Sequence, residues 1–145
     1  MHSSWEDKRA MKTLYLIRGV SGSGKTTLAD IIIEAKGRRF AKSISADDFF
    51  TDENGDYHFE PMSLSMAHKY ALSETEKWME FGIKDIVVHN TFSRQWEAQE
   101  YIDKAKKYGY TINIIECQNR FDNVHDVPSY VIENMEKRWE RITEN

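Results

Sequence analysis

The chain has 145 residues and a mass of 17.1 kDa, a length that suits one ordinary domain and excludes two. Apolar residues make up 40% of it and charged residues 30%, which is typical of a soluble globular protein and excludes a disordered one. Its net charge of −4 argues against a protein that coats DNA non-specifically, because such binding needs a positive surface.

The first half of the chain alternates short apolar runs with a helical pattern. Residues 13–18 (TLYLIR) predict a buried strand that ends in a glycine. A helix is expected from Lys25 to Gly37, with an apolar face made of Leu28, Ile31, Ile32 and Ala35. Residues 40–45 predict a weaker strand, and Asn54-Gly55 predicts a loop or small hairpin over 51–60.

The second half continues the same alternation. Helices are expected over 61–81, over 93–108 and from Pro128 onward, the last with Val131, Met135, Trp139 and Ile142 as its apolar stripe. Strands are expected over 85–89 and 110–117. Strands separated by helices predict an α/β fold: a three-layer α/β/α sandwich around a mainly parallel sheet of four or five strands.

The sequence also indicates how the chain is organised. Residues 1–10 are polar and are expected to be a flexible extension, with residues 11–145 as a single domain. No apolar run approaches the roughly 20 residues that cross a membrane. Cys117 is the single cysteine, so it forms no internal disulfide; a buried, reduced thiol in a cytoplasmic protein is expected.

Residues 19–26 (GVSGSGKT) match the phosphate-binding pattern G-x-x-x-x-G-K-[ST] without a mismatch. Glycines let the backbone approach an anion closely, and the following helix aims its positive end at the same point. Lys25 would reach the β- and γ-phosphates of a nucleotide, and the Thr26 hydroxyl would ligate Mg²⁺. The predicted nucleotide-binding residues are Gly19, Val20, Ser21, Gly22, Ser23, Gly24, Lys25, Thr26 and Thr27.

A phosphate loop is shared by several classes of enzyme. A GTPase would need a guanine-reading Asn/Thr-Lys-x-Asp segment, and the sequence has none. The chain is also small for a mechanical ATPase. Phosphoryl transfer to a small or terminal acceptor is the class that remains favoured.

Asp47 and Asp48 follow the second predicted strand, at the edge where ligands collect in parallel sheets. A carboxylate there can accept the proton of an acceptor hydroxyl during phosphoryl transfer. The pair can equally cap a turn before Phe49-Phe50. Position alone leaves both interpretations open.

Several segments taken together resemble the phage-type polynucleotide kinase family of P-loop kinases, in its branch of small ATP-binding domains with a DDFF motif. The resemblance runs from Thr13 to Trp139 and rests on the segments IRGVSGSGKTTLA, SADDFF, NGDYHFEP, IVVHNTFSRQWE and NVHDVP. It implies ATP and Mg²⁺ as cofactors and a 5′-hydroxyl as acceptor. Asp47 matches the aspartate that activates this hydroxyl, which leaves Asp48 a supporting or structural role.

The resemblance also suggests the remaining site residues. Asn90 would hydrogen-bond a phosphate or a magnesium-bound water, whereas His89 stands where relatives often have aspartate and is not expected to bind metal. Arg120 is the candidate lid arginine that neutralises charge on the transferred group, with Arg94 as its substitute. Tyr57 is a candidate to touch the acceptor base or sugar.

Three functions stay open at this point. The first is a kinase for the terminal 5′-hydroxyl of a nucleic acid or a nucleoside-like acceptor. The second is a small-molecule kinase for a nucleoside, nucleotide or sugar, and the third is a non-catalytic ATP-binding module. The acidic balance, and Phe50 where the phage enzymes have a phosphate-holding arginine, count against long nucleic-acid acceptors.

Overall fold

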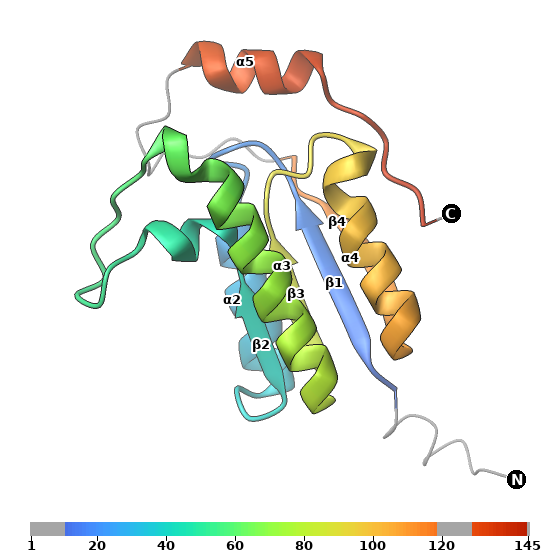
Figure 1. The fold of residues 1–145 in the computed structure, drawn as a ribbon. Helices are drawn as coiled ribbons and strands as arrows, with labels where there is room; N and C mark the ends of the chain where they lie inside the picture. The colour runs from blue at the N-terminus through green and yellow to red at the C-terminus, as the bar shows by residue number, and fades with distance from the viewer. Residues whose placement is uncertain (1–10, 119–128, 145) are drawn as a thin grey trace, which may run out of the picture.

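The computed structural model describes residues 11–118 and 129–144, which build a parallel sheet with helices on both faces (Figure 1). The strands are β1 (Thr13–Arg18), β2 (Ala41–Ile44), β3 (Asp85–His89) and β4 (Thr111–Glu116). The α-helices are α2 (Lys25–Lys36), α3 (Leu64–Phe81), α4 (Gln95–Tyr108) and α5 (Ser129–Lys137). Two short 3-10 helices, η1 (Ala46–Phe50) and η2 (Pro61–Ser63), lie between β2 and α3.

The four described strands run parallel in the order β2-β3-β1-β4. All five residues of β3 are buried, as expected of a strand covered on both faces. The register pairs Leu16 of β1 with Val88 of β3 and with Ile114 of β4. Because all strands point the same way, the loops after their carboxyl ends gather at one edge of the sheet.

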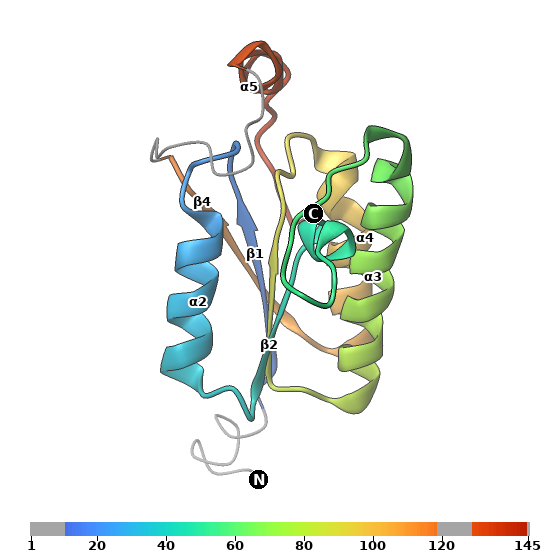
Figure 2. The same ribbon diagram turned by 90° about the vertical axis from the view of Figure 1, so that its left-hand side faces the viewer.

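The helices divide between the two faces of the sheet, which confirms the predicted α/β/α sandwich. Helix α2 covers one face, and α3 and α4 cover the other (Figure 2). The larger core cluster lies under α3 and α4 around Leu16, Ile86 and Ile102. A smaller cluster under α2 includes Ile17 and Ile33. The α5 helix lies beyond the carboxyl ends of the strands in both views.

The predicted apolar face of α2 is only half right, because Leu28 and Ile32 pack against the smaller core cluster but Ile31 and Ala35 do not. Ala29 and Ile33 are its buried residues, whereas Ile31 is 59% exposed and Ala35 is also exposed. Three consecutive isoleucines at 31–33 satisfy a helical repeat in more than one register. The helical repeat therefore does not determine which of these isoleucines packs against the sheet.

The stripe predicted for the last helix is also wrong in its second half. Helix α5 ends at Lys137, so Trp139 and Ile142 belong to an extended segment that returns past α4. Ile142 still packs against the larger core cluster. Trp96 is 70% exposed, whereas Trp78 and Trp139 are half-buried. Cys117 is a free thiol that is half-buried rather than buried.

Within the described part of the chain, no helix has the length and apolar character needed to cross a membrane.

Replacing Leu16 with alanine should destabilise the fold, because its side chain is 1% exposed in the centre of the sheet. We expect Leu16→Ala to lower the free energy of unfolding by about 2–5 kcal/mol. The matched change Ile31→Ala on α2 should stay within about 0.5 kcal/mol of the wild type. Urea denaturation measures both, and equal losses would contradict the assignment of the core.

Candidate nucleotide and acceptor site

The loop between β1 and α2 has a conformation that depends on its glycines. Gly22 and Gly24 have φ values of 80° and 95°, which side-chain-bearing residues rarely adopt. A side chain on Gly19 would place its Cβ 2.2 Å from the Ser23 hydroxyl oxygen. The loop is therefore closed tightly, and the first turn of α2 follows it directly. Such a loop directs backbone N–H groups and the positive end of a helix at a bound anion.

Lys25 begins α2 and reaches back over this loop. Its ammonium donates hydrogen bonds to the carbonyl oxygens of Gly19 and Val20 at 2.8 and 3.0 Å. Burial lowers the pKa of Lys25 to about 8, although the nearby charge of Asp47 opposes this shift. An anion in the loop would favour the charged form.

Other loop residues suit the phosphates of a nucleotide and a magnesium ion. Ser23 is fully buried, and its Oγ has no hydrogen-bond partner among the described residues. Thr26 and Thr27 are exposed in the first turn of α2. Three features suit the binding of a nucleotide's phosphates: the tight packing beside Gly19, the Ser23 hydroxyl without a described partner, and the ammonium of Lys25. The Thr26 hydroxyl is an oxygen donor of the kind that Mg²⁺ prefers.

The two aspartates after β2 have different surroundings. Asp48 accepts a hydrogen bond from the Ser45 N–H at 3.0 Å, and the Ser45 hydroxyl accepts one from the Asp47 N–H at 3.1 Å, which closes a capping box around η1. Burial raises the pKa of Asp48. The Asp47 carboxylate is exposed and accepts a hydrogen bond from the Tyr57 hydroxyl at 3.1 Å. Burial, and secondarily Asp47, raise the pKa of Tyr57.

The end of β3 ties this turn to the sheet. Asn90 Oδ1 accepts a hydrogen bond from the Ala46 N–H at 2.8 Å. Asn90 Nδ2 and the Tyr101 hydroxyl are buried without a hydrogen-bond partner among the described residues. His89 Nε2 lies 3.0 Å from Ser43 Oγ on β2. Burial and the charge of Lys25 lower the pKa of His89 to about 4, so the ring is neutral at physiological pH.

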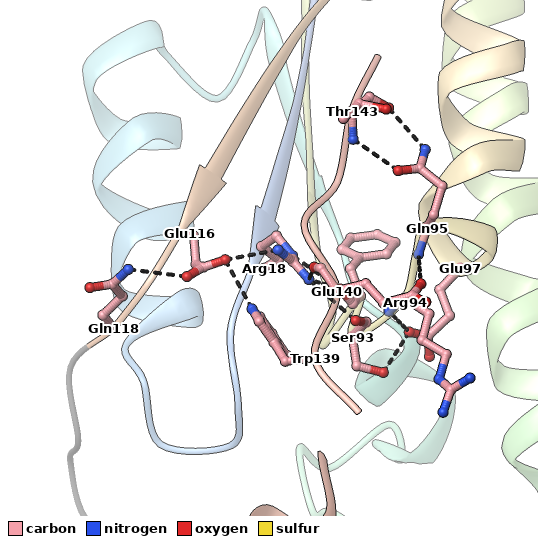
Figure 3. Close-up of polar contacts among 11 residues, drawn as sticks. Arg18, Ser93, Arg94, Gln95, Glu97, Glu116, Gln118, Trp139, Glu140 and Thr143 are labelled. Atoms are coloured by element: carbon pink, nitrogen blue, oxygen red, sulfur yellow. Dashed lines mark hydrogen bonds and ion pairs between the residues drawn. The ribbon is translucent and has the colours of Figure 1, made fainter. Parts of the chain in front are cut away.

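A buried arginine joins the phosphate loop to three segments that are distant in the sequence (Figure 3). Arg18, the last residue of β1, is 3% exposed. Its guanidinium donates to the Phe92 carbonyl oxygen at 2.7 and 3.0 Å and to the Glu140 carbonyl oxygen at 2.6 Å. It also pairs with the Glu116 carboxylate at 2.8 Å and lies 4.1 Å from the centroid of the Trp139 ring. Burial lowers the pKa of Arg18, and Glu116 opposes the shift.

Further hydrogen bonds hold the C-terminal segment against the start of α4. The Glu140 N–H donates to the Ser93 carbonyl oxygen at 2.7 Å. Gln95 and Thr143 exchange two hydrogen bonds, at 2.8 and 2.9 Å, as Figure 3 shows. Phe92, whose carbonyl Arg18 binds, has a φ of 47°, a conformation that non-glycine residues seldom adopt.

The structure brings together most of the residues predicted from the sequence. The phosphate loop, Lys25 and the turn that carries Asp47 meet at the carboxyl edge of the sheet. Arg94 is exposed at the start of α4, where its backbone N–H bonds Glu97. Arg120 lies outside the described residues. Sequence reasoning missed Arg18, although a charged residue at the end of a buried strand was a usable signal.

Comparison with known proteins places the chain in a family. A family model described as an AAA domain matches residues 14–124, which is most of the chain. The chain belongs to this family, and its fold is that of P-loop kinases.

Two curated relatives match nearly the whole chain. Uncharacterized protein PM0531 of Pasteurella multocida (strain Pm70) is 28% identical over 134 residues, which cover 86% of this chain and 75% of that protein. NEDD4-binding protein 2 of Homo sapiens is 28% identical over 138 residues, which cover 89% of this chain but 8% of that protein.

Solved structures share the fold. A chain of the Pnkp1/Rnl/Hen1 complex matches with a TM-score of 0.60 and 18% identity, over 86% of this chain and 38% of that one. A gluconokinase from Sinorhizobium meliloti 1021 matches with a TM-score of 0.59 and 16% identity, over 90% and 77%. A complex of AvrRxo1-ORF1 and ORF2 with ATP matches with a TM-score of 0.51 and 25% identity, over 78% and 39%.

The affinity for ATP should fall as the pH rises above 8, because unbound Lys25 then loses its proton. Binding of the phosphates would require that proton to be taken up again, so the Kd should rise by up to about tenfold per pH unit. Calorimetric titration with ATP between about pH 7 and 10 measures this slope. Lys25→Arg keeps its charge over this range and is the control; a slope equal to that of the wild type would assign the effect to another group.

Replacing Arg18 with methionine should destabilise the protein strongly, because it leaves the carbonyls of Phe92 and Glu140 and the Glu116 carboxylate without their partner. We expect a loss of about 3–5 kcal/mol in the free energy of unfolding. Arg38→Met removes an exposed ion pair with Glu34 and should cost less than about 1 kcal/mol. Urea denaturation measures the free energy of unfolding of both variants. Equal losses would contradict the prediction that the buried hydrogen bonds of Arg18 stabilise the fold more than an exposed ion pair does.

Proposed function

We propose that this member of the AAA domain family transfers the γ-phosphoryl group of ATP, with Mg²⁺, to a terminal 5′-hydroxyl of a nucleic acid or a nucleoside-like compound. The observation that carries the proposal is the exposed Asp47 carboxylate, which lies near Lys25 at the carboxyl edge of the sheet and is oriented by Tyr57. The phosphate-binding half and a potential base thus share one site.

Residues of the phosphate loop would bind and orient the nucleotide. Backbone N–H groups of residues 19–24 and the Lys25 ammonium would hold the phosphate oxygens. Mg²⁺, held by the Thr26 hydroxyl, would withdraw charge from the β- and γ-phosphates. His89 contributes no charge here, because its pKa of about 4 keeps it neutral beside Lys25.

Asp47 would act on the acceptor. The hydroxyl oxygen forms a bond to the γ-phosphorus while the bond from that phosphorus to the bridging oxygen of ADP breaks. The hydroxyl proton passes to the Asp47 carboxylate, and ADP leaves with the bridging oxygen. Tyr57 donates a hydrogen bond to Asp47 Oδ1 and would in this way orient the carboxylate that takes up the proton.

The capping box gives Asp48 a structural role. Its carboxylate accepts a hydrogen bond from the Ser45 N–H, so Asp48 would stabilise the turn that carries Asp47. Asn90 would support the same turn through the Ala46 N–H. We propose Arg120 as the lid arginine on sequence grounds, with Arg94 as its substitute, and residues 11–145 as one kinase domain in the cytoplasm.

The structural neighbours support a kinase and leave the acceptor open. They include a chain of the Pnkp1/Rnl/Hen1 complex and a gluconokinase, so this fold serves proteins with different acceptors. The acceptor is therefore decided by the local segment around Asp47 rather than by the fold.

Asp47→Asn should retain ATP affinity and lose about 10²–10⁴-fold in kcat, since it keeps the shape of the side chain but cannot accept the proton. Labelled ATP, offered with 5′-hydroxyl oligonucleotides and with a panel of nucleosides, measures the transfer. Asp56→Asn is the matched control, because this exposed carboxylate lies in the loop that follows η1 and has no assigned role. Unchanged kcat in Asp47→Asn would remove Asp47 from the reaction. ATP binding without transfer to any acceptor would favour a non-catalytic module.

A further inference from the structure

A cavity of about 300 Å³ lies in the segment that follows Asp47. Its walls come from η1, from the loop 51–60 and from η2, and they include Phe49, Phe50, Asp52, His58 and Glu60. The roles proposed above use none of these wall residues. The cavity is large enough for a ring system of nucleobase size.

Aromatic rings form one part of its surroundings. Phe50 packs edge-on against Phe59 at 5.2 Å between ring centroids and against Tyr57 at 6.2 Å. Tyr57 and Phe59 lie nearly parallel, with an interplanar angle of 10°. Of these rings, Phe49 and Phe50 line the cavity, and Phe49 is the more exposed of the two at 37%. Because the Tyr57 hydroxyl binds Asp47, this aromatic group is attached directly to the candidate base. A flat ring would find stacking partners here.

The charge of the same segment is strongly negative. Between Lys42 and Lys69 the sequence has no lysine or arginine and six acidic residues: Asp47, Asp48, Asp52, Glu53, Asp56 and Glu60. Two of these, Asp52 and Glu60, line the cavity itself. Hydrogen bonds from the Asp56 N–H and from His58 lower the pKa of Asp52, so this carboxylate stays ionised. Even with both histidines of the segment protonated, acidic groups remain in excess.

We propose that this cavity receives an acceptor that has a flat ring and a hydroxyl but no phosphate, with a nucleoside as the reference compound. The inference rests on the proposed function, because it names the acceptor of the Asp47 reaction. A nucleotide or an oligonucleotide would bring its phosphates toward Asp52 and Glu60, and like charges repel each other. The Phe49 and Phe50 rings in the wall would supply binding energy that needs no charge on the ligand.

The wild-type protein with saturating ATP distinguishes the acceptor classes. The kcat/KM values of a nucleoside, its 3′-monophosphate and a 5′-hydroxyl oligonucleotide are compared at about 50 and about 300 mM salt. We expect the nucleoside to be preferred by about tenfold or more, with no dependence on salt. Salt should raise kcat/KM for the two phosphate-bearing acceptors, because it screens their repulsion.

The other outcomes separate the two proposals. A preference for the oligonucleotide, with kcat/KM falling as salt increases, would overturn the present inference and leave the proposed kinase function standing. Absence of transfer to every acceptor would overturn the proposed function, and this inference with it.

A charge reversal on the wall provides a second test. Glu60→Lys should raise the ratio of kcat/KM for the 3′-monophosphate over the nucleoside by about tenfold. Because Glu60 also accepts a hydrogen bond from the Met62 N–H, Glu60→Gln is measured beside it as the milder change, with a smaller rise in the same ratio. Glu34→Lys makes the same charge change at an exposed pair on α2 and should leave the ratio unaltered. Equal ratios in Glu60→Lys and Glu34→Lys would overturn the assignment of the cavity.

Discussion

The buried guanidinium of Arg18 is the interaction on which the arrangement of the site most depends. Arg18 is the residue directly before the phosphate loop, and its partners come from the loop before α4, from β4 and from the C-terminal segment. Removing the guanidinium would leave several carbonyl oxygens unsatisfied in a buried place, which proteins rarely tolerate. One side chain therefore places the phosphate loop, the strained residue Phe92 and the segment after α5 relative to one another.

Hydrogen bonds between neighbouring strand ends position the turn that carries Asp47 in the same way. Asn90 binds the Ala46 N–H across the boundary between β3 and η1, and His89 meets Ser43 on β2. The capping box of Ser45 and Asp48 then turns the chain so that Asp47 points to solvent. Burial at this edge lowers the pKa values of both Lys25 and His89. Burial thus favours the neutral forms of the two basic side chains at this edge of the sheet.

The parts that the sequence predicted correctly depend on local chemistry. The phosphate loop is recognisable because each of its positions has a chemical requirement that only one or two residue types meet. The central strands β1 and β3 were recognisable because they are short apolar runs whose residues are mostly buried. The role of Asp48 could also have been found, since Ser45 and Asp48 have capping-box spacing. Arg18 could not be assigned its partners, because Phe92 and Glu140 are 74 and 122 residues away in the chain. The buried face of α2 was ambiguous because neighbouring isoleucines fit several registers.

The net charge of −4 is distributed unevenly, and this has a consequence for how two substrates share one edge of a sheet. The phosphate side combines the positive end of α2 with Lys25, whereas the segment from Asp47 to Glu60 contains acidic groups and no lysine or arginine. On the proposed function, a triphosphate entering the site would be attracted to the loop and repelled from the cavity beside Phe49, so its orientation would be determined before any acceptor binds. The cavity would then be left to ligands that bind through ring stacking and a hydroxyl group. Charge separation of this kind would assign each substrate to its own half of a site that has no separate acceptor domain among the described residues.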